Sequence, residues 1–301
     1  MSENSLSEFE RHFGLWGVKG QEKLRRMTVA VGGIGGIGAI SALMLAKAGI
    51  GRIIICDRDS YGVENIVEQA FATYDTAGVE KIIAAKREMQ RHTRHSKITA
   101  FTADLSEAKA ARRLLADADI LVSGVDNAAA RLALGKGCSQ KKIPMVVSAN
   151  VGWSIFHTVY FPGEFNYASL WKDVPGLKWK AGFPDMTDAT TRALVQKEWN
   201  IWVLALSEFE PNAIRQFIER DQSYYWYAAP QAYFAASLGV LDAIKILLGE
   251  GDIFRFPNVL YYDMRHNTTL GREEILKRRT LLSKAWDCGI DALVQATRAW
   301  R

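Results

Sequence analysis

The sequence predicts an α/β fold in which helices cover both faces of a doubly wound, Rossmann-like and mostly parallel sheet. A helical, aromatic-rich insertion is expected in the second half. Three observations predict this class. Short apolar runs rich in β-branched residues alternate with helix-length segments through the first half of the chain, and a glycine-rich turn follows the first run. The 301 residues are 49% hydrophobic and 24% charged, which is typical of globular proteins and not of disordered chains.

Predicted strands and helices follow one another in the order that builds a parallel sheet. The run 27–32 is apolar, rich in valine and bounded by glycine, as expected for a buried strand. The first helix ends at Gly49, and Ser106 is the expected N-cap of the third. The predicted strands are 27–32, 51–56, 97–102, 120–123 and 144–149, and the predicted helices between them are 36–49, 79–94, 106–116 and 127–139.

The turn after the first strand, Gly32 to Gly38, contains five glycines in seven residues. Glycine lets the backbone turn tightly and approach a phosphate, and the following helix N-terminus favours an anion. Asp57 ends the second strand, where a carboxylate can bind ribose hydroxyls. This pair predicts a nucleotide site without choosing between NAD, FAD and ATP, and a purely structural glycine turn is the alternative.

Further motifs occur in a fixed order around this turn. They are Arg11 to Leu24, Asp57-Arg58-Asp59, Asn65 to Gln69, Gly78 to Lys81, Asp126-Asn127 with Arg131, and Pro230 to Gly249. Together they resemble the ThiF/MoeB/HesA and ubiquitin-activating-enzyme superfamily of adenylyltransferases. The resemblance runs from about residue 8 to 265 and is weak between about 162 and 228.

The resemblance implies that a carboxylate attacks the α-phosphate of MgATP, giving an acyl-adenylate and pyrophosphate. It places Lys81 on the phosphates, Asp126 on Mg²⁺, and Arg11 across a homodimer interface at the partner's triphosphate. These three residues are the expected catalytic set. The expected nucleotide-binding residues are Gly33, Gly35, Gly36, Asp57, Asp59, Asn65, Gln69, Lys81 and Asn127.

Each of these residues also has a structural interpretation. Lys81 could simply begin a basic, solvated helix, and Asp126-Asn127 could cap the helix that follows. Arg11 could pair with a nearby glutamate. Arg131 is expected to anchor a loop and not to touch ligand.

One residue departs from the family pattern. Glu68 stands where relatives usually carry an arginine that binds the triphosphate. An anion beside an anion is unfavourable in a site that excludes water. Either Arg11 or Arg58 substitutes for that cation, or the use of ATP is altered.

The three cysteines limit the chemistry. They are too few for a disulfide framework or a four-cysteine zinc site, and no CxxC pair occurs, so no zinc is expected and a cytoplasmic, reducing compartment is indicated. Residues 139–287 contain no cysteine, which argues against an enzyme thioester. Cys56 is expected to be buried on the second strand, and Cys138 lies on a predicted helix where it matches a common non-catalytic cysteine of the family. Cys288 is expected to be packed.

Neither the first residues nor the apolar segments predict a signal peptide or a membrane span. The first residues lack the basic and apolar regions of a signal peptide. The most apolar helical segment, 228–248, is interrupted by Gln231, Asp242 and Lys245.

Four parts are expected along the chain: a helical arm at 1–26, an ATP-binding core at 27–160, a substrate-specific insertion at 161–229, and the rest of the same fold at 230–301. Residues 151–230 hold 17 aromatic residues in 80 positions, including the run 224–227. Either the insertion needs them for its own core, or they line a groove for a peptide or protein tail. One or two helices are expected over 188–220, and His157 is expected to be a core histidine.

The net charge of +5 is concentrated between Lys81 and Arg113, with nine Lys/Arg against three Asp/Glu. A solvated helix face is the first interpretation, and phosphates or an anionic peptide are the next. Nucleic acid is not the expected partner, although one branch of the superfamily modifies tRNA.

The leading hypothesis is therefore a homodimeric, Mg²⁺- and ATP-dependent adenylyltransferase that forms no enzyme thioester. The absence of zinc and thiol motifs favours the branch that modifies ribosomally made peptides, as in microcin and pantocin biosynthesis, with dehydration or cyclisation as the outcome. The alternatives are activation of the C-terminus of a ubiquitin-like sulfur carrier, a non-catalytic protein-binding subunit, and an NAD-dependent oxidoreductase. The sequence gives neither the carboxylate nor its acceptor.

Overall fold

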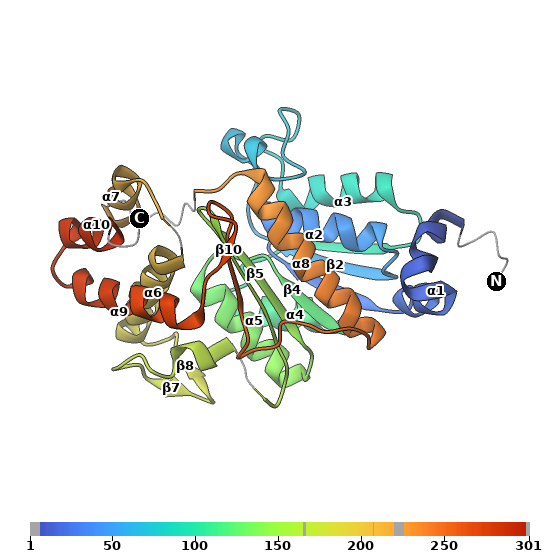
Figure 1. Cartoon of the computed structure of the whole chain (residues 1–301). Helices are drawn as coiled ribbons and strands as arrows, with labels where there is room; N and C mark the ends of the chain where they lie inside the picture. The colour runs from blue at the N-terminus through green and yellow to red at the C-terminus, as the bar shows by residue number, and fades with distance from the viewer. Residues whose placement is uncertain (1–6, 165–166, 207, 220–225, 299–301) are drawn as a thin grey trace.

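A computed structural model describes residues 7–164, 167–206, 208–219 and 226–298 (Figure 1). One eight-stranded sheet runs through these residues in the order β10-β9-β6-β5-β4-β1-β2-β3. Two residues of the predicted aromatic run, Tyr224 and Tyr225, lie outside the described residues.

Five neighbouring strands are parallel, which confirms the predicted fold class. They are β1 (Thr28–Gly32), β2 (Arg52–Asp57), β3 (Lys97–Thr102), β4 (Ile120–Ser123) and β5 (Met145–Val151). Gly32 on β1 pairs with Cys56 on β2 and with Ser123 on β4. The glycine turn, Asp57 and the loop carrying Asp126 therefore leave the sheet at one edge.

Three antiparallel strands extend the sheet beyond β5. They are β6 (Ser154–Tyr160), β9 (Leu260–Asp263) and β10 (Thr268–Thr269). β5 and β6 form a hairpin around Gly152, whose φ is +55°. Pairing with β6 carries β5 to Val151, past the predicted end at residue 149.

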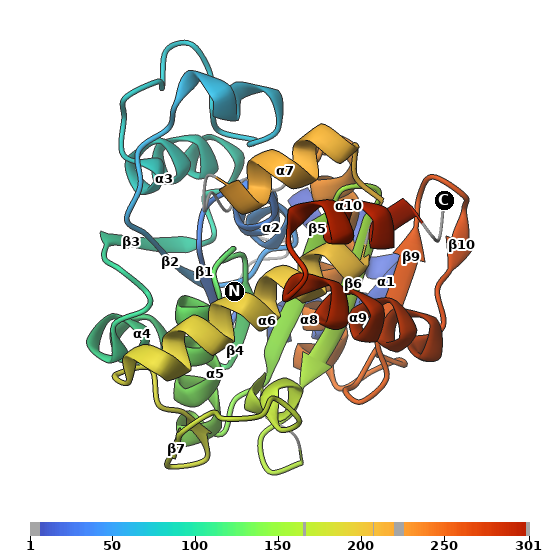
Figure 2. The ribbon, with the colours of Figure 1, turned by 90° about the vertical axis from the view of Figure 1, so that its left-hand side faces the viewer.

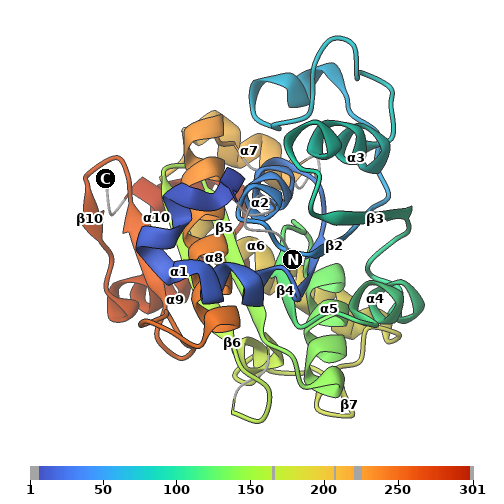
Figure 3. The same ribbon diagram turned by 90° about the vertical axis from the view of Figure 1, so that its right-hand side faces the viewer.

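Helices cover both faces of the sheet. On one face α2 (Gly36–Lys47), α3 (Lys81–His92) and α8 (Ala229–Leu248) pack their apolar side chains against the strands. On the other lie α4 (Ala108–Leu115), α5 (Ala128–Lys141) and α6 (Ala189–Leu206). The arm α1 (Glu10–Leu24) lies at the end of the molecule where α8 ends (Figure 3). By length and composition α8 could cross a membrane, but 56% of its most apolar window is buried in this fold, where it packs on α2 and β5.

A second group of helices lies at the opposite end from α1 (Figures 1 and 2). α6, α9 (Arg272–Trp286), α10 (Ile290–Arg298) and α7 (Pro211–Glu219) contact one another there. The segment 188–220 thus contains two helices, α6 and α7. Shorter elements are η2 (Ser7–Phe9), η3 (Val63–Val67), η4 (Tyr167–Trp171), β7 (Trp179–Lys180) and β8 (Phe183–Pro184).

Two local expectations are wrong. Ser106 is not the N-cap of α4, because both its hydroxyl and its N–H donate to Asp104 Oδ1, and the helix begins after Glu107. Cys288 is exposed in the turn between α9 and α10 and is not packed.

His157 is a core histidine as predicted. It is fully buried, with its ring nitrogens 2.9 Å from Ser148 Oγ and 3.0 Å from Asp242 Oδ2.

Candidate active site

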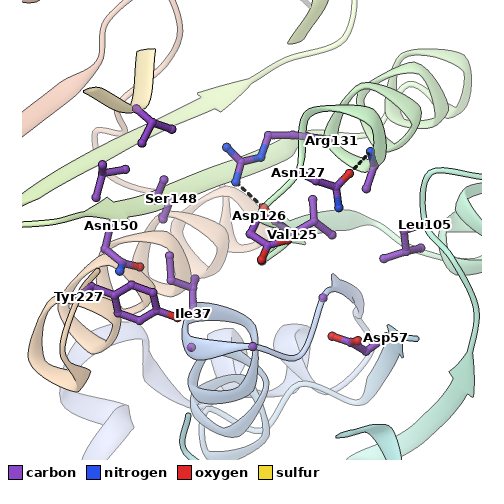
Figure 4. Close-up of a pocket in the computed structure, with 18 of the residues that line it drawn as sticks. Ile37, Asp57, Leu105, Val125, Asp126, Asn127, Arg131, Ser148, Asn150 and Tyr227 are labelled. Atoms are coloured by element: carbon purple, nitrogen blue, oxygen red, sulfur yellow. Dashed lines mark hydrogen bonds between the residues drawn. The ribbon is translucent and has the colours of Figure 1, made fainter. Parts of the chain in front are cut away.

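A cavity of about 550 Å³ opens at the carboxyl ends of the parallel strands (Figure 4). One half, here called the nucleotide half, is built by the glycine turn, the ends of β2 and β4, η3 and the first turn of α3. The other half comes from β6, η4, α6 and β9, and residues 148–151 of β5 also line the cavity. We call this other half the aromatic chamber, and its side chains are Phe156, Tyr167, Leu170, Trp171, Trp199, Trp202, Val203, Leu206 and Tyr261.

The glycine turn lets the backbone itself form the floor of the nucleotide half. Gly33 has a φ of +86°, and a Cβ there would lie 2.8 Å from the backbone of Gly124. Gly35 is the N-cap of α2 and Gly36 its first residue, and both line the cavity. A helix N-terminus whose first residues carry no side chain of their own is suited to a phosphate.

Asp57 stands beside this turn with its carboxylate fixed. Its Oδ2 accepts from the Ile34 N–H at 2.5 Å, and its Oδ1 accepts from the Asp59 N–H at 2.8 Å. Burial raises the pKa of Asp57, while Lys81 and these hydrogen bonds oppose that shift. The carboxylate thus ties the two loops together and still lines the cavity, as expected of a ribose acceptor.

Lys81 begins α3 and reaches the same half of the cavity. It is only 8% exposed, and its Nζ lies 3.8 Å from Asp59 Oδ2. Its backbone N–H donates to the Asp59 carbonyl, which fixes where the side chain starts. Lys81 is therefore held, mostly buried, beside the proposed phosphate position and is not on a solvated helix face.

The pair Asp126-Asn127 is predicted to bind Mg²⁺ or to cap the following helix, and the structure assigns the cap to Asn127. Asn127 is the N-cap of α5, and its Oδ1 accepts from the Ala130 N–H at 2.8 Å. Asp126 is exposed at the cavity wall. No group of three His, Cys, Asp or Glu side chains within the described ranges could hold a metal by itself. A Mg²⁺ at Asp126 would have to share its coordination with nucleotide phosphates, which is the usual arrangement for this ion.

The Glu68 carboxylate accepts hydrogen bonds from two side chains, one of them distant in the sequence. The Tyr227 hydroxyl donates to its Oε2 at 2.8 Å, and Gln69 Nε2 donates to its Oε1 at 2.7 Å. A Cβ on Gly36 would lie 2.7 Å from the Tyr227 hydroxyl and 3.0 Å from Glu68 Oε2. The carboxylate and the hydroxyl therefore lie directly against the N-terminus of α2. Burial raises the pKa of Glu68, and the bonds from Tyr227 and Gln69 oppose that shift.

We expect Glu68→Gln to bind ATP about 5-fold more tightly than wild type at pH 8, because it removes an anion from the phosphate position. Since burial raises the pKa of Glu68, the wild-type carboxylate should become neutral as the pH falls, and the difference in affinity should shrink as the pH is lowered. Calorimetric titration of both proteins with MgATP at several pH values measures it. Equal dissociation constants at every pH would contradict the assignment.

All the predicted nucleotide-binding residues line this cavity, together with Asp126. Arg11 does not: it is exposed on α1, and its proposed function at a partner's site stays a prediction. Arg58 lines the cavity but its guanidinium is engaged by Asp104 at 2.6 Å. Sequence reasoning missed Tyr227 as a neighbour of Glu68 and Arg131 as a cavity residue.

The arrangement has known counterparts. The family model of the ThiF family matches residues 9–283. The chain belongs to the ThiF family. The molybdopterin-synthase adenylyltransferase of Escherichia coli is a relative, 31% identical over 174 residues that make up 56% of this chain and 70% of the relative. The adenylyltransferase and sulfurtransferase MOCS3 of Culex quinquefasciatus is 34% identical over 48% of this chain, which covers only 34% of that protein.

Solved structures of this fold include a complex of MccB with MccA. Escherichia coli MccB, determined with MccA, superposes with a TM-score of 0.68 over 90% of this chain and 71% of MccB, at 20% identity. The same protein has been determined with ATP, with a TM-score of 0.65 over 88% of this chain and 70% of MccB, also at 20% identity. The likeness confirms the fold. This ThiF-family chain therefore shares its family with named adenylyltransferases.

Proposed function

We propose that this ThiF-family adenylyltransferase transfers AMP from ATP to a carboxylate. One observation carries the proposal: a single cavity joins the glycine turn, Lys81 and Asp126 to a chamber that can take a second substrate. A carboxylate oxygen attacks the α-phosphorus, the bond from that phosphorus to the bridging oxygen breaks, and pyrophosphate leaves. Such a reaction needs positioning and charge neutralisation from the protein.

Different groups position the nucleotide and neutralise its charge in this proposal. The N-terminus of α2 and Lys81 bind phosphate oxygens, and Asp57 accepts from the ribose hydroxyls. Asp126 would hold Mg²⁺, which neutralises phosphate charge when it is bound.

No thiol serves as an acyl acceptor in this proposal. Cys56 and Cys138 are buried, and burial raises the pKa of Cys56 to about 12, with Asp57 adding to the shift. Cys288 is exposed but does not line the cavity. The adenylated carboxyl group is thus captured by a group outside the enzyme or within the substrate.

We propose a ribosomally made peptide as the substrate, with dehydration or cyclisation as the outcome. The aromatic chamber and the fold likeness to MccB, determined with MccA, support it. The C-terminus of a ubiquitin-like sulfur carrier is the second candidate, since relatives at 30% identity or more are named for molybdopterin synthase and sulfur transfer.

One experiment distinguishes the two candidate substrates. The protein is incubated with MgATP and either short peptides or a diglycine-tailed carrier protein, and pyrophosphate release and product mass are followed. Release with a peptide and loss of water from it supports the first candidate. Release with the carrier alone supports the second, and ATP binding without release on any substrate would refute adenylation.

We expect Lys81→Ala to lower pyrophosphate release about 100-fold, because a buried cation at the phosphates is lost. Lys86→Ala removes an exposed lysine from the same helix and should leave the rate unchanged. Initial rates of pyrophosphate release measure both. A full rate in Lys81→Ala would show that this lysine does not touch the phosphates.

A homodimer is part of the proposal. Arg11 lies on α1 beside Leu15, whose side chain is 73% exposed, and Val18 is also exposed. An apolar surface next to an arginine fits a contact between two copies.

A further inference from the structure

Arg131 is a buried cation at the junction of the two halves of the cavity. It extends from α5, is 7% exposed and lines the cavity wall (Figure 4). Its Nη2 donates to the carbonyl of Val125, the residue before Asp126. The guanidinium therefore lies beside the proposed position of the reacting phosphate.

The charge of Arg131 is not neutralised by the neighbours that the structure describes. Its guanidinium lies over the Trp199 ring, 4.9 Å from the centroid. Burial raises the pKa of the Tyr167 hydroxyl, and Arg131 beside it opposes that shift. Among the described residues no carboxylate forms an ion pair with Arg131, and its Nε–H has no hydrogen-bond partner. Burying a guanidinium without an anion is costly, so this position is suited to an anionic ligand.

The aromatic chamber on the other side of Arg131 carries no charge of its own. Its walls are tryptophan, tyrosine, phenylalanine and aliphatic side chains, without a lysine or a carboxylate. Trp199 and Trp202 come from one turn of α6, and Trp171 closes the chamber from η4. Such a chamber binds a large apolar group, preferably a ring that can pack against these faces.

We propose that Arg131 binds the carboxylate of the acyl substrate and that the aromatic chamber binds a large apolar or aromatic side chain next to that carboxylate. The proposal rests on the adenylation proposed above and narrows its substrate to an acid flanked by such a group. Arg131 pairs with the carboxylate oxygens while Val125 O holds its other side. The carboxylate then lies beside Asp126, between the nucleotide half and the chamber.

Binding without ATP tests this inference separately from adenylation. The probes are N-acetyl-phenylalanine, its amide and N-acetyl-glycine, titrated calorimetrically and by quenching of tryptophan fluorescence. Wild type should bind N-acetyl-phenylalanine at least about 10-fold more tightly than either other probe. No binding of N-acetyl-phenylalanine, or equal binding of acid and amide, would overturn the proposal.

Variants of Arg131 and Trp202 test which residue causes each of the two binding preferences. Arg131→Gln should lose the preference for acid over amide, and Arg131→Lys should restore part of it, while Lys136→Gln on the same helix should keep it. Trp202→Leu should lose the preference for phenylalanine over glycine and keep that for the acid. A normal acid preference in folded Arg131→Gln would refute the function given to Arg131. If the probe binds as expected but no carboxylate supports pyrophosphate release, adenylation fails and this binding site stands.

Discussion

Replacing Asp126 by alanine is expected to lower pyrophosphate release by about 100-fold to 1,000-fold. Asp126 follows β4 and is exposed to the cavity beside the N-terminus of α5, while the side chain of Asn127 caps that helix. The substitution therefore removes the oxygen ligands proposed for Mg²⁺ and leaves the cap intact. Initial rates with MgATP and a responsive peptide measure the effect.

Two comparisons separate charge from structure in this prediction. Asp126→Asn keeps the shape and loses the charge, so it should be nearly as slow as Asp126→Ala. Asp75→Asn removes an exposed carboxylate that does not line the cavity and should keep the full rate. Unchanged melting temperatures in all three would show that the loss is chemical, and a full rate in Asp126→Asn would exclude a charge-dependent function for Asp126.

The parallel core could be predicted because each of its elements carries its own signal. β3 and β4 begin and end at the predicted residues, 97–102 and 120–123. The N-cap of α4 could not be predicted, because Asp104 competes for the hydroxyl and the N–H of Ser106. Two local hydrogen-bonding partners of similar strength leave the sequence pattern ambiguous.

The nucleotide half of the cavity was predictable for a topological reason. Strand ends of a parallel sheet meet at one edge, so residues after β1, β2 and β4 converge whatever the details of packing. The other half depends on how distant segments pack. Tyr227 reaches Glu68 across 159 residues of sequence, and Trp171, Trp199 and Tyr261 come from three separate elements. Nothing in the local pattern of η4, α6 or β9 fixes which aromatic side chains face the cavity.

Replacing Gly38 by alanine is expected to lower the free energy of unfolding by about 3 kcal/mol or more, and the melting temperature by about 5 °C or more. A Cβ on Gly38 would lie 1.8 Å from the carbonyl oxygen of Gly33. The neighbouring Gly124 is also closely packed, since a Cβ there would lie 2.8 Å from the Gly38 Cα. These contacts are with backbone, so no side chain can move aside.

The same turn supplies the control. Gly35→Ala places its Cβ 3.8 Å from Gln69 Nε2, an ordinary contact, so it should lower the melting temperature much less than Gly38→Ala does. The comparison is informative because Gly33 and Gly38 of the glycine turn both lie against the backbone of Gly124. Gly124 belongs to the loop that carries Asp126, so these contacts hold the two loops together. Gly38→Ala should therefore weaken ATP binding as well as stability, measured by thermal unfolding with and without MgATP. If Gly38→Ala melted like Gly35→Ala, the backbone contact would not hold the two loops in their relative positions, and the placement of Asp126 against the nucleotide half would need another cause.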